Sequence, residues 1–412
     1  MKPPANTALA RQQMAADAAV RPGAVMPMAE SIYGVGKMTT EKGTNRAVRR
    51  ENRNRIFRYI CKHGRSSNPA IASALKMSLP TVLQNTRELL ACGILRDAGE
   101  LDSTGGRKAK TVDVVSNYRC SVGIDITREH IILVLTNLSG ENVDRERVYL
   151  PFRDEEEYFR QMRVYLQKFL VRNQVEKEKL LGVGFSIPGI INHHRNRIDR
   201  SHVLGLSDYP LEHFSGDIPC RTWFMNDANA GAFAEGFHAE KGDHFFYLSL
   251  NNTVGGGFYD GEQLLRGDHY RVGEVGHLII VPDGKRCYCG QRGCSDPYLS
   301  AQYLAEESDN SMRCFFERLN EGRDDALRRW EEYVRILAIL IHNIHVTLDC
   351  DIIIGGYVGS AIGQRIEDVR NEVRRLDLFE QEAGYIRPCV FQISESAFGA
   401  ALYEMETFLS QV

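Results

Sequence analysis

Apolar residues recur at helical intervals from about residue 44 to residue 92, and the pattern then changes to short extended runs. Asn68 followed by a proline is typical of a helix start, and Gly93 is typical of a helix end. The elements expected from this pattern are helices over residues 44–63, 68–76 and 79–92 and strands over residues 94–96 and 110–114. Three helices followed by a β-hairpin predict a winged helix-turn-helix.

A different pattern begins at Cys120, where an extended run, a turn and a second extended run follow one another. A similar arrangement recurs from Phe245. Because strands alternate with helical stretches after both hairpins, the sequence predicts an α/β body made of two related halves. We expect helices over residues 155–174, 226–240, 298–319 and 324–348, a buried strand over 352–356 and a last helix over 396–410.

The composition is that of a globular protein, with 43% hydrophobic and 25% charged residues in 412. No apolar run reaches the roughly 18 residues that a membrane helix needs, and the N-terminus lacks the basic-then-apolar order of a signal peptide. Ten cysteines are too few for a disulfide scaffold. We therefore expect a cytoplasmic protein. Residues 1–43 show no sustained apolar period and are expected to be disordered.

Charge is unevenly distributed along the chain. Residues 1–115 carry 19 Lys and Arg against 9 Asp and Glu, whereas the remainder carries 32 against 45. A basic N-terminal third on an acidic body indicates a nucleic-acid-binding module attached to another domain. A chance fluctuation in charge is the alternative.

Three cysteines and a histidine lie within 18 residues, at His277, Cys287, Cys289 and Cys294. Three sulfur ligands and one imidazole nitrogen form a closed tetrahedral set, which is typical of a structural zinc site with no position open to water. Intervening glycines allow the loop to fold back so that the ligands converge. The alternative is a chance group of free cysteines.

Carboxylates and amides that suit polyol recognition occur at two places. Asn226 and Asp227 follow a short strand and open a helix, where they either face the cleft of an α/β sheet or only cap the helix. Glu274 lies three residues before the expected zinc ligand His277, which would fix its backbone. Its alternative is a surface acid.

Glycines at 255–257 and 355–356 offer backbone N–H groups for phosphate, although ordinary tight turns explain them at least as well. No glycine follows Asp125 in the first hairpin, and Glu129 would repel a polyphosphate there.

Polar and basic residues of the winged helix are candidates for DNA contact. Gln and Asn pair with adenine edges and Arg with guanine, while other basic side chains contact phosphates. An arginine at the wing tip would enter the minor groove. The candidates are Ser78, Thr81, Gln84, Asn85, Arg87, Arg107, Lys108, Arg49 and Arg53. A winged helix used for protein contacts is the alternative.

Together these residues resemble the ROK family of repressors, open reading frames and sugar kinases over residues 44–412. The stretch GEVGHLIIVPDGKRCYCGQRGCSD resembles the family's zinc and sugar signature, NDANAGAFAEG its sugar-site motif, GFSIPGIIN its sugar loop and IIIGG its adenosine-side motif. The resemblance implies a duplicated actin/hexokinase-like (RNase H-like) fold whose closing helix returns to the first half. It also implies sugar contacts by Asn226, Asp227, Glu274, His277, Asp296 and Gly189.

Departures from the family pattern place the chain among the repressors. Family kinases carry an Asp-x-Gly-Gly-Thr loop for ATP phosphates, whereas residues 125–129 here read Asp-Ile-Thr-Arg-Glu. Asp227, the general base of a kinase, would then only accept hydrogen bonds. Asp296 stands where the family usually has a sugar-contacting Glu. The winged helix is similar to that of the family's repressors.

The sequence thus predicts a zinc-containing, sugar-responsive DNA-binding repressor of carbohydrate metabolism genes, which acts as a homodimer or homotetramer and is not an enzyme. A sugar kinase with an added DNA-binding domain is the first alternative, and a regulator whose effector is a protein or a phosphorylated sugar is the second. The expected division is an extension over 1–43, a winged helix over 44–115, a first subdomain over 118–235 joined by the helix 396–410, and a second subdomain with the zinc loop over 236–395.

Overall fold

The computed structural model describes residues 45–100, 109–239, 242–306, 308, 310–377, 379, 382–391 and 394–411. The expected N-terminal extension and the wing-tip residues Arg107 and Lys108 lie outside the described residues. Among the helices of this described part, none has the length and apolar character needed to cross a membrane.

The N-terminal module is a winged helix, as predicted. Its elements are α2 (Asn45–His63), β1 (Ser66–Ser67), α3 (Asn68–Ala74), α4 (Leu79–Ala91), β2 (Leu95–Glu100) and β3 (Lys110–Val114), with the strands in the order β1-β3-β2. The cap of α3 is Ser67 rather than the expected Asn68, because the Ser67 hydroxyl accepts the Ala70 N–H at 3.3 Å. The short strand β1 was not expected from the sequence, since two polar residues carry no period.

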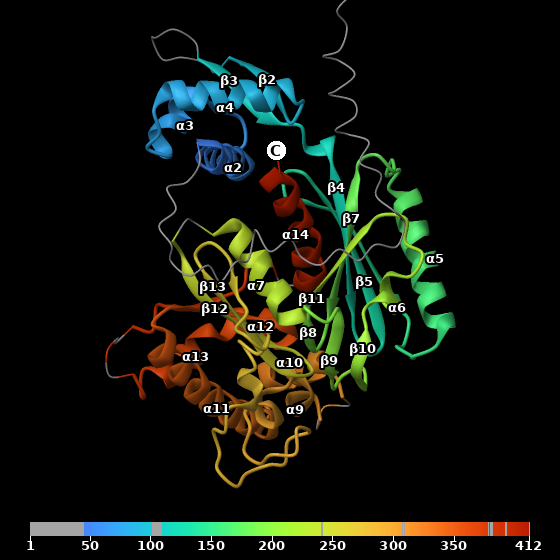
Figure 1. Cartoon of the computed structure of the whole chain (residues 1–412). Helices are drawn as coiled ribbons and strands as arrows, with labels where there is room; N and C mark the ends of the chain where they lie inside the picture. The colour runs from blue at the N-terminus through green and yellow to red at the C-terminus, as the bar shows by residue number, and fades with distance from the viewer. Residues whose placement is uncertain are drawn as a thin grey trace, which may run out of the picture.

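The first half of the body is a five-stranded sheet in the order β11-β7-β4-β5-β6, with a small sheet β10-β9-β8 beside it. The strands are β4 (Cys120–Ile126), β5 (His130–Asn137), β6 (Asn142–Tyr149), β7 (Leu180–Ile187), β8 (Ile190–Asn192), β9 (Arg197–Ser201), β10 (Leu206–Pro210) and β11 (Arg221–Asn226). The helices are α5 (Glu156–Arg172), α6 (Glu212–Ser215) and α7 (Asp227–His238). Figure 1 shows α5 covering the outer face of the sheet.

The second half repeats this plan, with a five-stranded sheet in the order β14-β13-β12-β15-β16. The strands are β12 (His244–Leu250), β13 (Val254–Asp260), β14 (Leu264–Leu265), β15 (Asp351–Gly355) and β16 (Ile386–Pro388). The helices are α8 (Asp296–Leu299), α9 (Ala301–Ala305), α10 (Met312–Asn320), α11 (Asp324–Leu348), α12 (Gly356–Ile362) and α13 (Ile366–Val373). In both halves an antiparallel hairpin pairs with a parallel strand, which confirms the predicted duplicated α/β fold.

The single helix expected over residues 298–319 is wrong, because three short helices occupy this region. Ser300 adopts an extended backbone (φ −65°, ψ 151°) and ends α8. Asn310 has a positive φ of 52°, and the hydroxyl of Ser311 then caps α10 by accepting the Cys314 N–H at 3.3 Å. These serine- and asparagine-based interruptions satisfy backbone groups locally and so compete with a continuous helix.

The last helix, α14 (Glu395–Gln411), returns to the first half and packs on β4, β7 and α7. Glycine makes the approach possible: a Cβ at Gly123 would lie 1.7 Å from the Ala397 carbonyl oxygen, and one at Gly184 would lie 2.3 Å from that of Ala400. The indole N–H of Trp223 donates to the Ala400 carbonyl at 2.7 Å. The predicted closing helix is therefore confirmed.

The same helix also contacts the winged helix (Figure 1). Ile56, Phe57 and Ile60 of α2 are fully buried in one apolar cluster that includes Met405 and Leu409 of α14. Beside this cluster, Arg58 of α2 forms an ion pair with Glu406. The winged helix therefore packs against the body through α14.

A buried carboxyl group at the start of α14 makes stability depend on pH. Glu395 accepts hydrogen bonds from the Tyr247 hydroxyl at 3.2 Å and the Gly356 N–H at 3.1 Å, yet burial raises its pKa from 4.5 to about 7. Since the native state holds this proton more tightly than the unfolded chain, the contribution of Glu395 to stability falls as pH rises from 4.5 through 7.

Glu395→Gln keeps the accepting oxygen and removes the titration. We expect the free energy of unfolding of the variant, compared with that of the native protein, to rise by roughly 3 kcal/mol from pH 4 to pH 8. Denaturant unfolding at the two pH values measures the difference. Parallel pH profiles for the two proteins would contradict the assignment.

Candidate ligand cleft, metal centre and DNA-binding surface

A cavity of about 510 Å³ lies between the two halves of the body. Residues from both halves line it, and most of them offer polar groups. The lining residues include Gly189, His202, Asn226, Asp227, Ser249, Thr253, Gly255, Glu274 and Tyr288. The cavity thus brings together four of the predicted sugar-contacting residues.

The first-half wall of the cavity is built at the start of α7. Asn226 caps this helix, since its side-chain oxygen accepts the Asn229 N–H at 3.0 Å. Its amide nitrogen donates to the Gly189 carbonyl at 2.9 Å and to Asp227 Oδ1 at 3.0 Å. Gly189 has a φ of 141°, and an added Cβ would lie 2.5 Å from the Arg200 carbonyl oxygen. Asn226 therefore both caps α7 and lines the cavity, so the two alternatives expected from the sequence occur together.

The second-half wall presents Glu274. A Cβ at the preceding Gly273 would lie 2.0 Å from the Gly256 carbonyl oxygen, so the backbone at Gly273 packs directly against the backbone of β13. Burial, followed by the charge of Asp227, raises the pKa of Glu274 to about 7. Burial also raises the pKa of Asp227. Two carboxyl groups that face one cavity from opposite halves are well placed to accept hydrogen bonds from a polyol.

The four predicted metal ligands converge. One donor atom from each of His277, Cys287, Cys289 and Cys294 lies within 4.8 Å of all the others. The Sγ atoms of Cys289 and Cys294 are 3.7 Å apart, and so are Cys287 Sγ and His277 Nδ1. Two sulfur ligands of tetrahedral zinc at 2.3 Å lie about 3.8 Å apart, so the spacing and the donor set fit such an ion.

The two ring nitrogens of His277 face different partners. Nδ1 points to Cys287, whereas Nε2 lies 3.3 Å from the hydroxyl of Tyr288 and 3.9 Å from Glu274 Oε2. A histidine bound to metal through Nδ1 carries its proton on Nε2. His277 thus has its donor directed toward the two cavity residues Glu274 and Tyr288.

Two aromatic residues of the cavity were not identified from the sequence. His202, from the turn between β9 and β10, stacks on Tyr288 of the cysteine loop with ring centroids 3.7 Å apart and planes 8° apart. They come from opposite halves, and no local pattern links residues so far apart in the chain. The position of Tyr288 between two expected metal ligands was the available indication.

Asp296 lies apart from the other predicted sugar contacts. It is buried, it does not line the cavity, and its Oδ2 accepts the Val254 N–H at 2.7 Å. Burial raises its pKa to about 6. In this structure Asp296 therefore holds the start of β13, and direct sugar contact by Asp296 stays a prediction.

A second hollow of about 390 Å³ lies between Asp125, Thr127, Asn251 and Tyr357. Burial raises the pKa of Asp125 to about 7. Two backbone N–H groups that follow β15 already have side-chain acceptors. Gly356 N–H donates to Glu395, and Tyr357 N–H donates to Asn251 Oδ1 at 2.8 Å.

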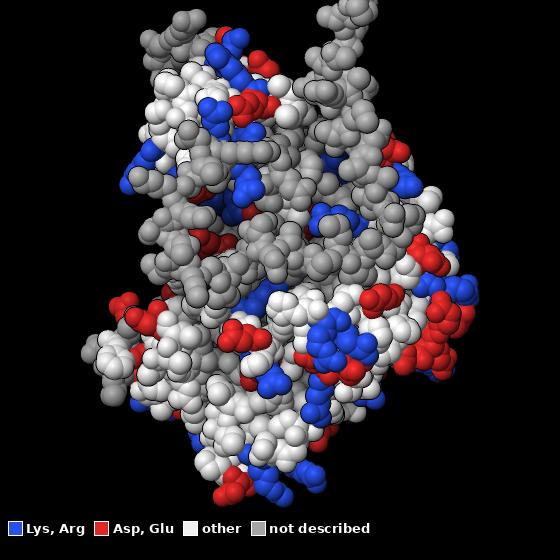
Figure 2. All heavy atoms as spheres, viewed as in Figure 1, with Lys and Arg blue, Asp and Glu red and all other residues white. Residues whose placement is uncertain are grey.

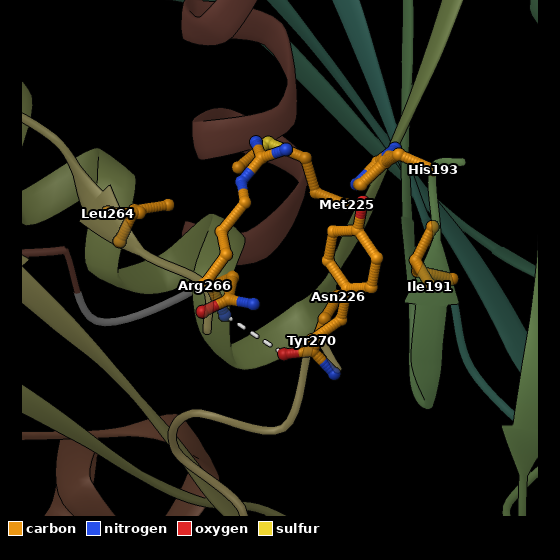
Figure 3. A pocket seen from close by; sticks show the side chains of 8 residues that line it. Ile191, His193, Met225, Asn226, Leu264, Arg266 and Tyr270 are labelled. Atoms are coloured by element: carbon orange, nitrogen blue, oxygen red, sulfur yellow. Dashed lines mark hydrogen bonds between the residues drawn. The ribbon is translucent and has the colours of Figure 1, made fainter. Parts of the chain in front are cut away.

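A third hollow of about 360 Å³ shares Asn226 with the main cavity, and Figure 3 shows the side chains that line it. His193 and Tyr270 meet there with ring centroids 5.5 Å apart, and Arg266 and Leu264 line the opposite side. Burial lowers the pKa of His193 to about 3, so this imidazole is neutral at neutral pH.

The DNA-contact candidates divide by exposure. Ser78, Gln84, Arg87 and Arg49 are exposed and Thr81 is partly exposed. Base contact by Asn85 is the expectation that needs correction, because this residue is only 3% exposed and its amide donates to the Thr81 carbonyl at 2.7 Å.

The guanidinium of Arg53 is also occupied, since it donates to Glu88 on α4 at 3.2 Å. Figure 2 shows Lys and Arg side chains over the winged helix with some Asp and Glu among them, and groups of both signs over α5, where Glu157 pairs with Arg160.

Two family models match the chain. One is described as the ROK family and matches residues 121–405, and the other is described as a winged helix-turn-helix DNA-binding domain and matches residues 49–96. Among similar proteins, the xylose repressor of Caldicellulosiruptor bescii is 25% identical over 70% of this chain and 72% of its own length. The DNA-binding transcriptional dual regulator NagC of Escherichia coli K12 is 23% identical over 60% of this chain and 62% of its own length.

Solved structures show the same architecture. A ROK family transcriptional regulator, a homologue of the E. coli MLC protein, superposes with a TM-score of 0.67 at 18% identity and covers 89% of this chain and 100% of its own. A ROK family glucokinase from Streptomyces griseus, solved with glucose and AMPPNP, gives 0.59 at 21% identity over 69% of this chain and 98% of its own. At these identities the similarity establishes the fold.

Proposed function

Because the chain belongs to the ROK family and carries a winged helix-turn-helix ahead of the family domain, we propose that it is a sugar-responsive transcriptional repressor of carbohydrate metabolism genes. The observation that carries the proposal is the presence of both modules in one chain. The similarity to proteins named xylose repressor and DNA-binding transcriptional dual regulator NagC supports it. We place its action in the cytoplasm.

Selection of bound duplexes from a random DNA pool tests the DNA-binding part. We expect an enriched inverted repeat, because a dimer or tetramer presents two winged helices related by symmetry. The enriched sequence then serves as the probe for release by sugars. A pool without enrichment, with and without sugars, would contradict the repressor function.

The effector is proposed to be a monosaccharide or a sugar derivative bound in the 510 Å³ cavity. Asp227 and Glu274 supply the acceptors that hydroxyl groups need, and Asn226 and Gly189 lie beside them in the cavity lining. Zinc at His277 and the three cysteines would hold the loop that carries one wall of this cavity. In that role the ion is structural, since four protein ligands leave no position for a substrate.

Contacts between the cleft and the winged helix provide a route for the response. The Ser396 hydroxyl donates to the Asp227 carbonyl at 3.1 Å, which joins the starts of α7 and α14, and α14 then packs on α2. A sugar lowers DNA affinity only by as much as it prefers the arrangement that binds DNA less well. The domain boundaries expected from the sequence are part of this proposal.

Arg87→Ala tests the DNA-facing side of α4. Arg87 is exposed there, so its loss is expected to weaken operator binding by about 5- to 100-fold if it reads a guanine. Arg53→Ala removes the same charge from the winged helix, but its guanidinium is held by Glu88, and we expect a smaller effect. Fluorescence anisotropy at fixed salt gives both affinities. Equal losses would mean that only net charge matters.

A sugar kinase is the second candidate, favoured by Asp227 at the boundary between the sugar cavity and the 390 Å³ hollow. It predicts sugar-dependent ADP release that Asp227→Asn abolishes. The occupied N–H groups of Gly356 and Tyr357 and the glycine-free turn after Asp125 weigh against it. An assay with a broad sugar panel decides between the two.

A further inference from the structure

Tyr288 lies in the cavity against the metal-ligand candidate His277. His277 has one outward nitrogen, Nε2, and the hydroxyl of Tyr288 lies 3.3 Å from it. With Nδ1 directed to Cys287, a single N–H remains, and a single N–H donates to one well-aligned acceptor. A sugar hydroxyl that accepts from His277 therefore has to displace the hydroxyl of Tyr288.

The ring of Tyr288 stacks against a residue of the first half. His202 stacks on it at 3.7 Å with nearly parallel planes, and both rings line the cavity with Asp227 and Glu274. His202 is exposed, whereas Tyr288 is only partly exposed, so the imidazole is the outer layer of the pair. The stack is therefore a direct contact between the β9–β10 turn and the loop that carries Cys287 and Cys289.

From this geometry we infer that Tyr288 is a specificity-determining residue that competes with the sugar for His277, and that His202 holds it in the competing position. The inference rests on the proposed sugar binding. A ligand is selected when it has a hydroxyl able to reach both Nε2 of His277 and the carboxyl group of Glu274, because only such a ligand compensates for the lost Tyr288 bond. Sugars without a hydroxyl at that place leave the pair closed.

The test compares calorimetric titrations of the native protein and Tyr288→Phe with D-glucose, D-xylose and N-acetyl-D-glucosamine. Phenylalanine keeps the stack on His202 and removes only the competing oxygen. We expect the sugar that binds the native protein to bind the variant about two- to tenfold more tightly, which corresponds to one hydrogen bond. Tyr209→Phe is the matched control, since its hydroxyl contacts Asp154 outside the cavity.

A second variant separates the stack from the hydroxyl. His202→Ala is expected to tighten binding as well, and the double variant with Tyr288→Phe should gain less than the product of the two single effects, because both act on one ring. Equal zinc content in all variants shows that the loop is intact, as position 288 lies between two metal ligands.

The outcomes distinguish the inference from the function on which it rests. Absence of binding to the native protein by any of the three sugars and by the wider panel overturns both. Binding to the native protein that is unchanged or weaker in Tyr288→Phe overturns the inference alone, since the hydroxyl would then be neutral or would contact the sugar directly.

Discussion

Replacing Cys289 with serine is expected to give protein that retains no zinc and melts at least about 10 °C lower. The four donors lie within 4.8 Å of one another, so removal of one sulfur leaves three ligands for an ion that needs four. Structural zinc contributes about 10–16 kcal/mol in isolated zinc-finger peptides, and even a fraction of this is a large share of the stability of a domain. Elemental analysis and thermal unfolding measure both effects.

Cys314→Ser is the matched control, because it makes the same chemical change on α10 of the same half, away from the cluster. It should keep one zinc per chain and nearly the native melting temperature. A strong chelator should lower the stability of the native protein and leave Cys289→Ser unchanged. A full zinc content in Cys289→Ser would exclude this ligand set.

Asp227→Asn is expected to lower sugar affinity by about 10- to 100-fold, because a hydrogen bond to a charged group contributes roughly 1.5–3 kcal/mol. The substitution keeps the shape of the side chain, and the helix cap is supplied by Asn226. DNA binding without sugar should remain, while the sugar concentration that releases DNA should rise by the same factor, since the two sites are linked.

Asp217→Asn provides the comparison, because Asp217 is an exposed acid of the same half that does not line the cavity. Calorimetry gives the affinities, and a mobility-shift titration gives the release curve. An Asp227→Asn protein that binds and responds to sugar like the native one would place the effector elsewhere.

The metal cluster was predictable from the sequence because its four ligands are near neighbours along the chain. Asn226, Asp227 and Glu274 were also predictable, as they end a strand or precede a ligand. His202 and Tyr288 were not predictable as a pair, because their contact depends on how the two halves meet and not on any local period.

The sequence pattern placed Asn85 wrongly among the DNA contacts, although its position on the helix indicates burial. Asn85 follows the buried Val82 by three positions and precedes the buried Leu89 by four, so the helical period alone places it on the inner face of α4. Its polar side chain suggested DNA contact, yet an amide can be buried when the Thr81 carbonyl accepts its proton. Here position on the helix decided the outcome, and residue type did not.

The return of α14 to the first half has a consequence for synthesis on the ribosome. The apolar face of β4, β5 and β7 is complete once β7 has emerged at residue 187, but the helix that covers it begins only at residue 395. At roughly 5–20 residues per second, translation from residue 187 to residue 395 takes roughly 10 to 40 seconds, and the apolar face stays uncovered for that time. Because α2 packs on the same helix, the winged helix can dock on the body only after α14 has formed, although it is among the first segments to be translated.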